Sequence, residues 1–439
     1  MKVMKFGGTS LGNPERMQQV IDLIFVEPES KIVVLSALSG TTNTLIEISN
    51  LLSTGYKVPA KQKIDELEKI YKKFVDELVK TEIAKEDAYK IIVEHFDFLN
   101  IILRISYSES LNKDILAQGE LLSTKLFCVA LSERQIQHTF LSALDFMCID
   151  ENEEPRLERI QRRLQVLMKD FPKETLFVTQ GYICRNVREE VDNLKRGGSD
   201  YTASLIAAVI DASVCEIWTD IDGMHNNDPR VVEKTKPIEV LSFEEAAELA
   251  YFGAKILHPT CIWPTQQKNV PVKLLNTMQP KATGTTIQQT AGSIGVKAIA
   301  AKDEIIAIKI KSSRMLLAHG FLRKIFEVFE KYKTSIDMVT TSEVAVAVTI
   351  DNDTRLKEII IELEQFGTVE VLKNQTIVSI VGNEISKTEY VLTSLFNAIK
   401  VIPITMVNYG GSAHNISLLI PSNYKKETLQ LLNKGLFNL

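Results

Sequence analysis

The chain has 439 residues, of which 51 are basic and 56 acidic, and both signs are spread along the sequence to leave a formal net charge of -5. This length predicts about two or three folding units, and the mixed charge argues against a nucleic-acid partner. The five cysteines are scattered and form no C-x-x-C pair, which argues against both a disulfide framework and a zinc site.

The sequence begins with MKVMKFGGTS, which lacks the apolar segment and the cleavage site of a secretory signal. No later run of uninterrupted apolar residues is long enough to span a bilayer. We therefore expect a cytoplasmic protein that has no membrane partner.

Strand-like and helical segments alternate in the first part of the chain. Residues 3–6 and 31–36 are predicted to be buried strands, and residues 14–25 a helix between them. Residues 61–110 have a long charged helical pattern instead, which predicts a helical insertion. Strand-like runs return at residues 176–180, 214–219 and 270–275. This order predicts an α/β domain over residues 1–285, with a mainly parallel sheet covered by helices.

Short elements in the order β-α-β-β-α-β follow a glycine-containing connection at residues 291–295. Strands are expected at residues 335–339 and 369–372 among others, and again at residues 376–381. The first set of elements predicts one ferredoxin-like unit over residues 300–373. A second copy over residues 374–439 stops one strand short, so we expect the two units to share strands or one to be inserted in the other. Such small units are expected to act as a paired regulatory module that also joins subunits.

A glycine-rich turn follows the first predicted strand and contains Lys5, Gly7, Gly8 and Ser10. Backbone N–H groups and the helix dipole favour a phosphate at such a strand-to-helix junction, and Lys5 adds a positive charge. The spacing is not that of a P-loop. The segment therefore predicts a phosphate site of another kind, or else only a tight turn.

A second glycine-rich turn, RGGSDYTA, begins at Arg196 and runs into a strongly helical segment. An arginine suits bidentate binding of a carboxylate, and Asp200 could hold the ammonium group of a phosphate-binding lysine in place. The alternative is that Ser199 or Asp200 only caps the helix.

Two further segments carry polar residues that could contact a ligand. WTDIDG and DPR follow a predicted strand, at the edge of the sheet where α/β proteins bind ligands, although turn chemistry alone could explain their aspartates. FGAKILHP places Lys255 at the end of a predicted helix, where a positive charge is also favourable without any function.

Together with QGELLS at residues 118–123, the segments KFGGTS, RGGSDYTA, WTDIDG, DPR and FGAKILHP resemble the aspartokinases of the amino-acid kinase superfamily. The resemblance covers nearly the whole chain, and the two C-terminal units are similar to the ACT domains of that family. It implies a three-layer amino-acid kinase fold, followed by two ferredoxin-like ACT domains.

The resemblance implies that the chain transfers the γ-phosphate of ATP to the β-carboxylate of L-aspartate. This is the first step in the biosynthesis of lysine, threonine, methionine and diaminopimelate, and an end product regulates it. Mg²⁺ is expected to come with the ATP, without protein ligands. The implied catalytic residues are Lys5, Asp200 and Lys255.

The resemblance also assigns the binding residues. The ATP-binding set is Lys5, Gly7, Gly8, Ser10, Thr219, Asp220, His225, Arg230, Lys255 and Ile256, although His225 stands where close relatives have a tyrosine. The aspartate-binding set is Thr42, Glu120, Arg196, Gly197 and Ser199. Glu120 is expected to bind the ammonium group of aspartate, and Arg196 to bind a carboxylate.

The segment SIDMVTTSE resembles the effector-binding stretch of lysine-sensitive members. The effector is therefore expected to be lysine first and threonine second, bound between the ACT units of a homodimer or homotetramer. Leu317 and Ala318 replace polar residues of those members, which could mean weaker lysine binding or another effector. The implied effector residues are Met315, Gly320, Phe321, Leu322, Ser335, Ile336, Asp337, Ser342 and Glu343.

Two other functions remain as alternatives. Another kinase of the superfamily would keep the phosphate chemistry and change the acceptor, but the ACT-like pair and the motifs around Glu120 and Arg196 argue against it. A non-enzymatic amino-acid sensor would be expected to lack Lys5, Asp200 or Lys255, and all three are present. Because almost no residues follow the second ACT-like unit, we expect no fused homoserine dehydrogenase.

Overall fold

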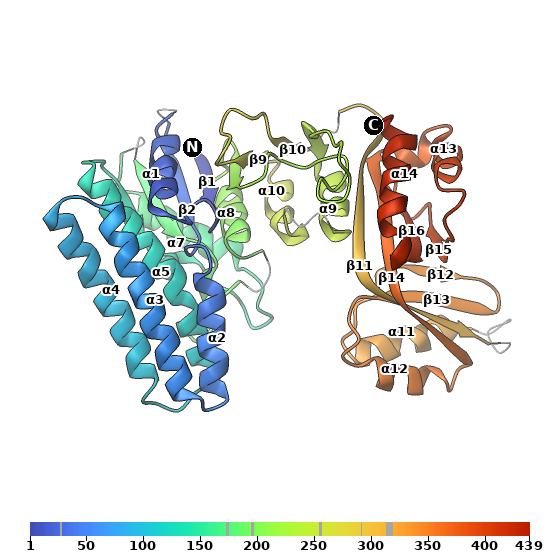
Figure 1. Cartoon of the computed structure of the whole chain (residues 1–439), viewed down its shortest axis with the longest axis horizontal. Coiled ribbons are helices and arrows are strands. Elements are labelled where there is room, and N and C mark those ends of the chain that lie inside the picture. The colour runs from blue at the N-terminus through green and yellow to red at the C-terminus, as the bar shows by residue number, and fades with distance from the viewer. Residues whose placement is uncertain (27–28, 173–174, 195–196, 254–256, 291, 313–318) are drawn as a thin grey trace. The chain divides into compact units, whose positions relative to one another are not determined.

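The computed structural model describes residues 1–26, 29–172, 175–194, 197–253, 257–290, 292–312 and 319–439. It divides into two compact units (Figure 1). The first unit comprises residues 1–224 and 257–289, and the second comprises residues 225–256 and 290–439.

The first unit is built on a mainly parallel sheet, as the alternation of strands and helices predicts. Its strands run in the order β3-β4-β2-β1-β7-β9-β10, and β10 is antiparallel to β9. Their bounds are β1 Lys2–Phe6, β2 Lys31–Leu35, β3 Thr139–Leu141, β4 Leu176–Gln180, β7 Cys215–Thr219, β9 Val272–Asn276 and β10 Thr285–Gln288. The loops after β1, β2, β4 and β7 therefore lie at one edge, because these strands are parallel.

The two faces of β1 serve different purposes, since successive side chains of a strand point to opposite faces. Met4 and Phe6 belong to a large apolar cluster with residues of the helices that pack on one face. Lys5 points to the other face, where α8 packs on β1. The central strand thereby contributes to the core and presents a charged side chain to the opposite layer.

Four long helices form a bundle in the first unit (Figure 1). They are α2 Thr41–Ser53, α3 Lys57–Leu78, α4 Glu82–Ile102 and α5 Glu109–Glu133, and α1 Pro14–Ile24 packs beside them. Among the helices described, α5 alone is long and apolar enough to cross a membrane, and 72% of that stretch is buried. It is therefore the core helix of the bundle, which packs on β2 and β4.

The remaining elements of the first unit are shorter. They are α6 Ala143–Phe146, α7 Leu157–Met168, α8 Gly198–Val209, the 3-10 helix η1 Pro259–Cys261, α10 Trp263–Gln267, and the hairpin strands β5 Ile183–Arg185 and β6 Val191–Asn193. Helix α8 contacts α7, α10 and η1 as well as the sheet.

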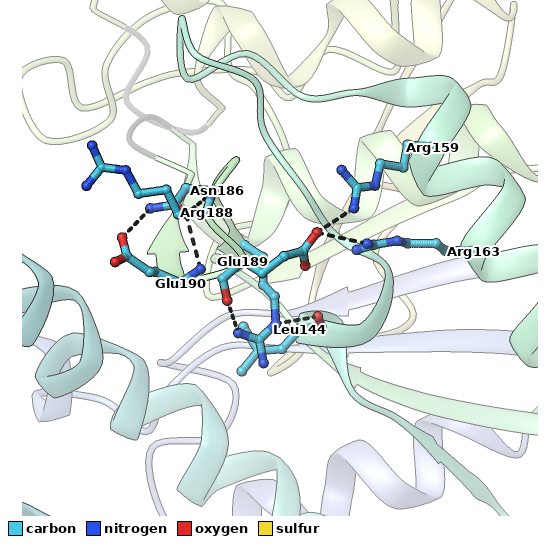
Figure 2. A network of polar contacts seen from close by, with 8 residues as sticks. Leu144, Arg159, Arg163, Asn186, Arg188, Glu189 and Glu190 are labelled. Carbon is cyan, nitrogen blue, oxygen red and sulfur yellow. Dashed lines mark hydrogen bonds and ion pairs between the residues drawn. The ribbon is translucent and has the colours of Figure 1, made fainter.

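The β5–β6 hairpin is held from several sides by charged side chains (Figure 2). Glu189 in its turn pairs with Arg159 and Arg163 of α7. Asp192 pairs with Lys113 of α5 at 2.8 Å. The hairpin ends at Asn193, so these contacts fix the strand that leads toward the glycines at positions 197 and 198.

The second unit is built on one antiparallel sheet in the order β12-β13-β11-β14-β16-β15. Its elements are β8 Val240–Ser242, α9 Phe243–Tyr251, β11 Gly295–Lys311, α11 Phe321–Lys331, β12 Val339–Thr341, β13 Ala345–Ile350, α12 Leu356–Leu363, β14 Thr368–Asn383, η3 Ile385–Lys387, α13 Val391–Ala398, β15 Met406–Asn408, β16 Asn415–Pro421, η4 Ser422–Tyr424 and α14 Lys425–Phe437.

Two long strands, β11 and β14, run through both halves of this sheet. The second half of β11 pairs with β13, and its whole length pairs with β14, whose own second half pairs with β16. Each half has its own apolar cluster, with α11 and α12 on one and α13 and α14 on the other. The two ferredoxin-like halves therefore share two continuous strands.

Three sequence-based strand predictions in this unit were wrong in detail. Residues 369–372 and 376–381 were expected to be separate strands, but both lie within β14 because register shifts between β11 and β14 keep the pairing continuous. Residues 335–339 were expected to be a strand, but β12 begins only at Val339. Thr349 accounts for the difference, since its carbonyl oxygen and hydroxyl bind the N–H groups of Asp337 and Met338 outside any regular strand.

Candidate functional site

Lys5 and Asp200 form an ion pair at the edge of the sheet where the parallel strands end. The ammonium nitrogen of Lys5 lies 2.5 Å from Oδ1 of Asp200, and the two side chains are only 10% and 19% exposed. Asp200 lies in the first turn of α8, whose N-cap is Gly197, and no side chain of the described residues caps this helix. Among the described residues neither Asp200 nor Ser199 makes a capping hydrogen bond to α8, and the Asp200 carboxylate instead pairs with the Lys5 ammonium group.

The glycine turn after β1 leaves space around this ammonium group. A Cβ atom on Gly7 would lie 3.3 Å from Nζ of Lys5, and one on Gly8 would lie 2.9 Å from the carbonyl oxygen of Ala37. The N–H of Gly7 donates to the carbonyl oxygen of Trp218 at 3.2 Å. The turn is thus close to the loop after β2 and to the end of β7.

The other polar member of this turn, Ser10, is buried. Its hydroxyl shares a hydrogen bond of 2.7 Å with the Thr277 hydroxyl. Ser10 therefore anchors the start of the helical layer to the segment after β9.

Glu120 is a buried carboxyl group on α5, with an exposed fraction of 3%. Its Oε1 accepts a hydrogen bond of 3.3 Å from the N–H of Ala37. Among the residues that the structure describes, Oε2 has no hydrogen-bond partner. Burial raises the pKa of Glu120 to about 8, although the Ala37 N–H and the Lys5 charge favour the ionised form. A buried carboxyl with an unsatisfied oxygen is suited to an ammonium ligand.

Close backbone contacts shape the turn before α8. Gly197 has a φ of +76°, and a Cβ there would lie 2.2 Å from Sγ of Cys261, so only glycine fits. Ser199 is buried and packs on Gly181, where a Cβ would meet it at 2.3 Å. Thr42 is half-buried in the first turn of α2. Arg196, expected to bind a carboxylate, lies outside the described residues.

The residues expected to bind the nucleotide are distributed between the two units. In the first unit, Thr219 ends β7 and its hydroxyl donates to Asp220 at 3.1 Å. In the second unit, Nδ1 of His225 is 2.8 Å from the Thr235 hydroxyl, and Arg230 forms a bidentate pair with Asp228 at 2.9 and 2.8 Å. Lys255 and Ile256 lie outside the described residues.

The expected effector carboxylate already has two partners within the second unit. The Asp337 side chain is 1% exposed, and its Oδ1 lies 2.7 Å from the Lys302 ammonium nitrogen. The Tyr251 hydroxyl, at the end of α9, donates to the same oxygen at 2.8 Å. Lys302 also pairs with Asp351 at 2.9 Å. Although burial lowers the pKa of Lys302, the two aspartates raise it overall.

The other expected effector residues are more open. Ser335, Ser342 and Glu343 are exposed, and Ile336 packs partly against the apolar cluster of its half. Gly320 has a φ of +78° and caps α11, which begins with Phe321 and Leu322. Met315 lies outside the described residues, as do Leu317 and Ala318.

The sequence interpretation missed two contributors to the first site. The Ala37 N–H holds Glu120, and Gly181 makes room for Ser199. The sequence did contain a signal for these two residues. Ala37 and Gly181 each lie directly after a predicted strand of the parallel sheet, where ligand-binding loops gather. A backbone donor and a glycine have no reactive side chain, so residue type alone did not reveal them.

Comparisons with known proteins cover the whole chain. Residues 1–276 match the Amino acid kinase family, and residues 378–436 match the ACT domain family. The chain is 32% identical to lysine-sensitive aspartokinase 3 of Escherichia coli (strain K12), over 99% of both chains. It is also 32% identical to the chloroplastic aspartokinase 3 of Arabidopsis thaliana, over 99% of this chain and 81% of that one.

Solved structures agree with these relatives. The crystal structure of E. coli aspartokinase III in complex with aspartate and ADP, in the R-state, has a TM-score of 0.86 at 32% identity and covers 100% of both chains. The T-state complex of that protein with lysine and aspartate has a TM-score of 0.79 at 32% identity, over 100% of this chain and 99% of that one. The predicted fold class is confirmed, and this chain belongs to the aspartokinases of the amino acid kinase family.

Proposed function

We propose that this aspartokinase transfers the γ-phosphate of ATP to the β-carboxylate of L-aspartate and so catalyses the first step of lysine, threonine, methionine and diaminopimelate biosynthesis. We assign this reaction to residues 1–285, and its regulation to ACT units at 300–373 and 374–439. The observation that carries the proposal is the Lys5–Asp200 ion pair in the same unit as a buried, incompletely bonded Glu120.

The transfer brings two negatively charged reactants together, so the protein must align them and neutralise charge on the transferring group. Lys5 has the charge for this second task, and Asp200 holds its ammonium group in place. Gly7 and Gly8 allow phosphate oxygens to approach the backbone closely. No covalent enzyme intermediate is needed, because the aspartate carboxylate is itself the nucleophile.

We place the acceptor amino acid at Glu120, whose Oε2 would bind the ammonium group. Thr42, Gly197 and Ser199 would complete the pocket, and Arg196 would bind a carboxylate. Mg²⁺ would neutralise phosphate charge when bound with ATP. Among the residues described, no three His, Cys, Asp or Glu side chains are grouped to hold a metal ion. We assign the ion to the phosphates, because the resemblance to the aspartokinases implies that it comes with ATP.

Acceptor choice is the direct test of the proposed function. We expect aspartate to be phosphorylated and glutamate to be a poor substrate, because Glu120 and Arg196 fix both ends of the acceptor. One added methylene supplies only about 1 to 3 kcal/mol of discrimination. ADP release, measured with each acid at equal concentration in the presence of Mg²⁺ and ATP, gives the ratio of kcat/KM. Equal turnover of the two acids, or no turnover of aspartate, would overturn the proposal.

We further propose that lysine, or secondarily threonine, inhibits the enzyme at a site that includes Asp337 and the neighbouring residues Ser342 and Glu343. The buried Asp337 carboxylate suits an amino group, but the Lys302 ammonium group already lies beside it. We propose that an effector amino group competes with Lys302 for this carboxylate, whose Oδ2 has no hydrogen-bond partner among the described residues. Lys302 would then set the effector concentration that is needed for inhibition.

Lys302→Met is expected to lower the lysine concentration for half-inhibition about tenfold, because about 1.4 kcal/mol of competing interaction is removed. Asp337→Ala is expected to abolish inhibition and leave the activity without effector unchanged, since coupling between sites acts only when effector binds. Lys311→Met, on the same strand but with an exposed side chain, is the control. Lysine and threonine titrations of each variant measure the effect. Identical inhibition curves for the Lys302 and Lys311 variants would refute the competition.

Assembly and location complete the proposal. We propose that the ACT units of two subunits pair to form a homodimer, or a homotetramer of two such pairs, with the effector bound between them. We also propose that the enzyme works in the cytoplasm. Sedimentation with and without lysine would measure the assembly.

A further inference from the structure

Tyr71 is a fully buried tyrosine on α3, in the four-helix bundle, and lies outside every motif of the kinase site. Its hydroxyl shares a hydrogen bond of 3.0 Å with the hydroxyl of Thr41. Its ring packs edge-to-face on Phe96 of α4, with 5.9 Å between ring centroids. Burial raises the pKa of Tyr71, so its hydroxyl stays neutral and available for hydrogen bonding.

Thr41 is the first residue of α2 and ends the loop that follows β2. Gly40, just before it, has a φ of +82°, and the N–H of Thr41 donates to the carbonyl oxygen of Leu38 at 3.0 Å. The tight loop is therefore continuous with the start of the helix. A shift of Thr41 would move the loop as well.

The same loop packs against α5 at the residue before Glu120. A Cβ on Gly119 would lie 2.9 Å from Cβ of Ala37 and 3.4 Å from Cγ2 of Thr41. The absence of that Cβ lets the loop approach α5, and the Ala37 N–H then reaches Oε1 of Glu120 at 3.3 Å. One short segment thus connects the Thr41 hydroxyl to the proposed ammonium-binding carboxylate.

We propose that Tyr71 is a positioning residue for the acceptor pocket, which acts by holding Thr41 so that the Ala37 N–H orients Glu120. This inference rests on the proposed function, since it gives Glu120 the acceptor ammonium group. The helical bundle would thereby help to determine aspartate affinity.

Tyr71→Phe removes only the hydroxyl and leaves the buried Thr41 hydroxyl without this partner. We expect the KM for aspartate to rise about five- to tenfold, the factor that one buried hydrogen bond supplies. The KM for ATP should not change. The pH midpoint of the aspartate KM should move upward, because a looser Ala37 N–H favours the ionised Glu120 less. Steady-state kinetics in both substrates across pH measure all three.

Tyr89→Phe is the matched control, because Tyr89 is in the same bundle and its hydroxyl donates to Asp76 at 2.6 Å in an exposed position. Thr41→Val removes the other hydroxyl of this pair and should reproduce the Tyr71→Phe effect, and the double variant should add nothing further. Thr41→Ser keeps the hydroxyl, so its aspartate KM should equal that of the unmodified enzyme. Thermal unfolding of each variant separates a loss of stability from a loss of positioning.

Two results would overturn the inference. One is an aspartate KM that Tyr71→Phe leaves within twofold of the unmodified enzyme. The other is an equal rise of both KM values together with an unshifted pH midpoint, which would mean a general structural effect. Failure of the proposed function is distinguishable, since the unmodified enzyme would then not phosphorylate aspartate at all.

Discussion

Replacing Lys5 by alanine is expected to lower kcat by about 10²- to 10³-fold, the range seen when one preorganised donor to a charged transition state is removed. The negative charge that Lys5 is proposed to stabilise peaks on the transferring phosphoryl group, so the KM values for aspartate and ATP should change far less than kcat. Steady-state kinetics at saturating ATP give kcat and the aspartate KM separately.

Two companion variants show how Lys5 acts. Lys5→Arg keeps the charge but has a planar guanidinium group that fits Asp200 differently, so we expect a partial loss of kcat. Asp200→Asn removes the charge that holds the ammonium nitrogen at 2.5 Å, and should also lower kcat. A Lys5→Ala enzyme that retains near-normal kcat would remove Lys5 from the catalytic role, although the fold would be unaffected.

The affinity for aspartate is expected to depend steeply on pH because of Glu120. Burial raises the pKa of this carboxyl to about 8, so the protonated form predominates at pH 6 and 7 in the enzyme without substrate. Only the ionised form pairs with an ammonium group. The aspartate KM should therefore fall about tenfold from pH 6 to 7 and about fivefold from pH 7 to 8, and should level off by about pH 9.

Glu120→Gln tests the origin of this dependence. Glutamine keeps the size of the side chain and an oxygen for the Ala37 N–H but does not titrate, so the aspartate KM should be high and independent of pH. Calorimetry should detect proton release when aspartate binds the unmodified enzyme at pH 7. As the pH rises from about 4.5 to 8, the free energy of unfolding of the ligand-free enzyme should also fall relative to that of Glu120→Gln. Over this range the folded state keeps the Glu120 proton, whereas the unfolded state has lost it. A flat KM profile in the unmodified enzyme would contradict the assignment.

Strong local patterns made much of the fold predictable. The buried strands around Lys5 and at residues 31–35 are short, mostly apolar runs, and the charged helices after residue 61 have a period near 3.6 residues. The Lys5–Asp200 pair could also be predicted from the sequence, because each residue lies close to a pair of glycines. Lys5 is near the end of a strand, and Asp200 is at the start of a helix.

Other features depended on contacts that sequence periodicity does not encode. The continuity of β14 past residue 374 depends on its pairing with β11, some 70 residues earlier in the chain. The partners of Asp337 come from α9 and β11, so its segment gave no sign that Lys302 lies beside it. The role proposed for Tyr71 has no local signal in the sequence, because its hydroxyl partner, Thr41, is 30 residues away.

The continuous strands β11 and β14 also determine how the regulatory region can fold. Neither half can complete its sheet until residues 295–311 and 368–383 have met, so the search for this distant pairing must precede packing of both apolar clusters and should slow folding. Once paired, the halves have no independent boundary at which one could open alone. They should therefore melt together as a single cooperative unit, and a chain ended between them would expose an unpaired, aggregation-prone strand edge.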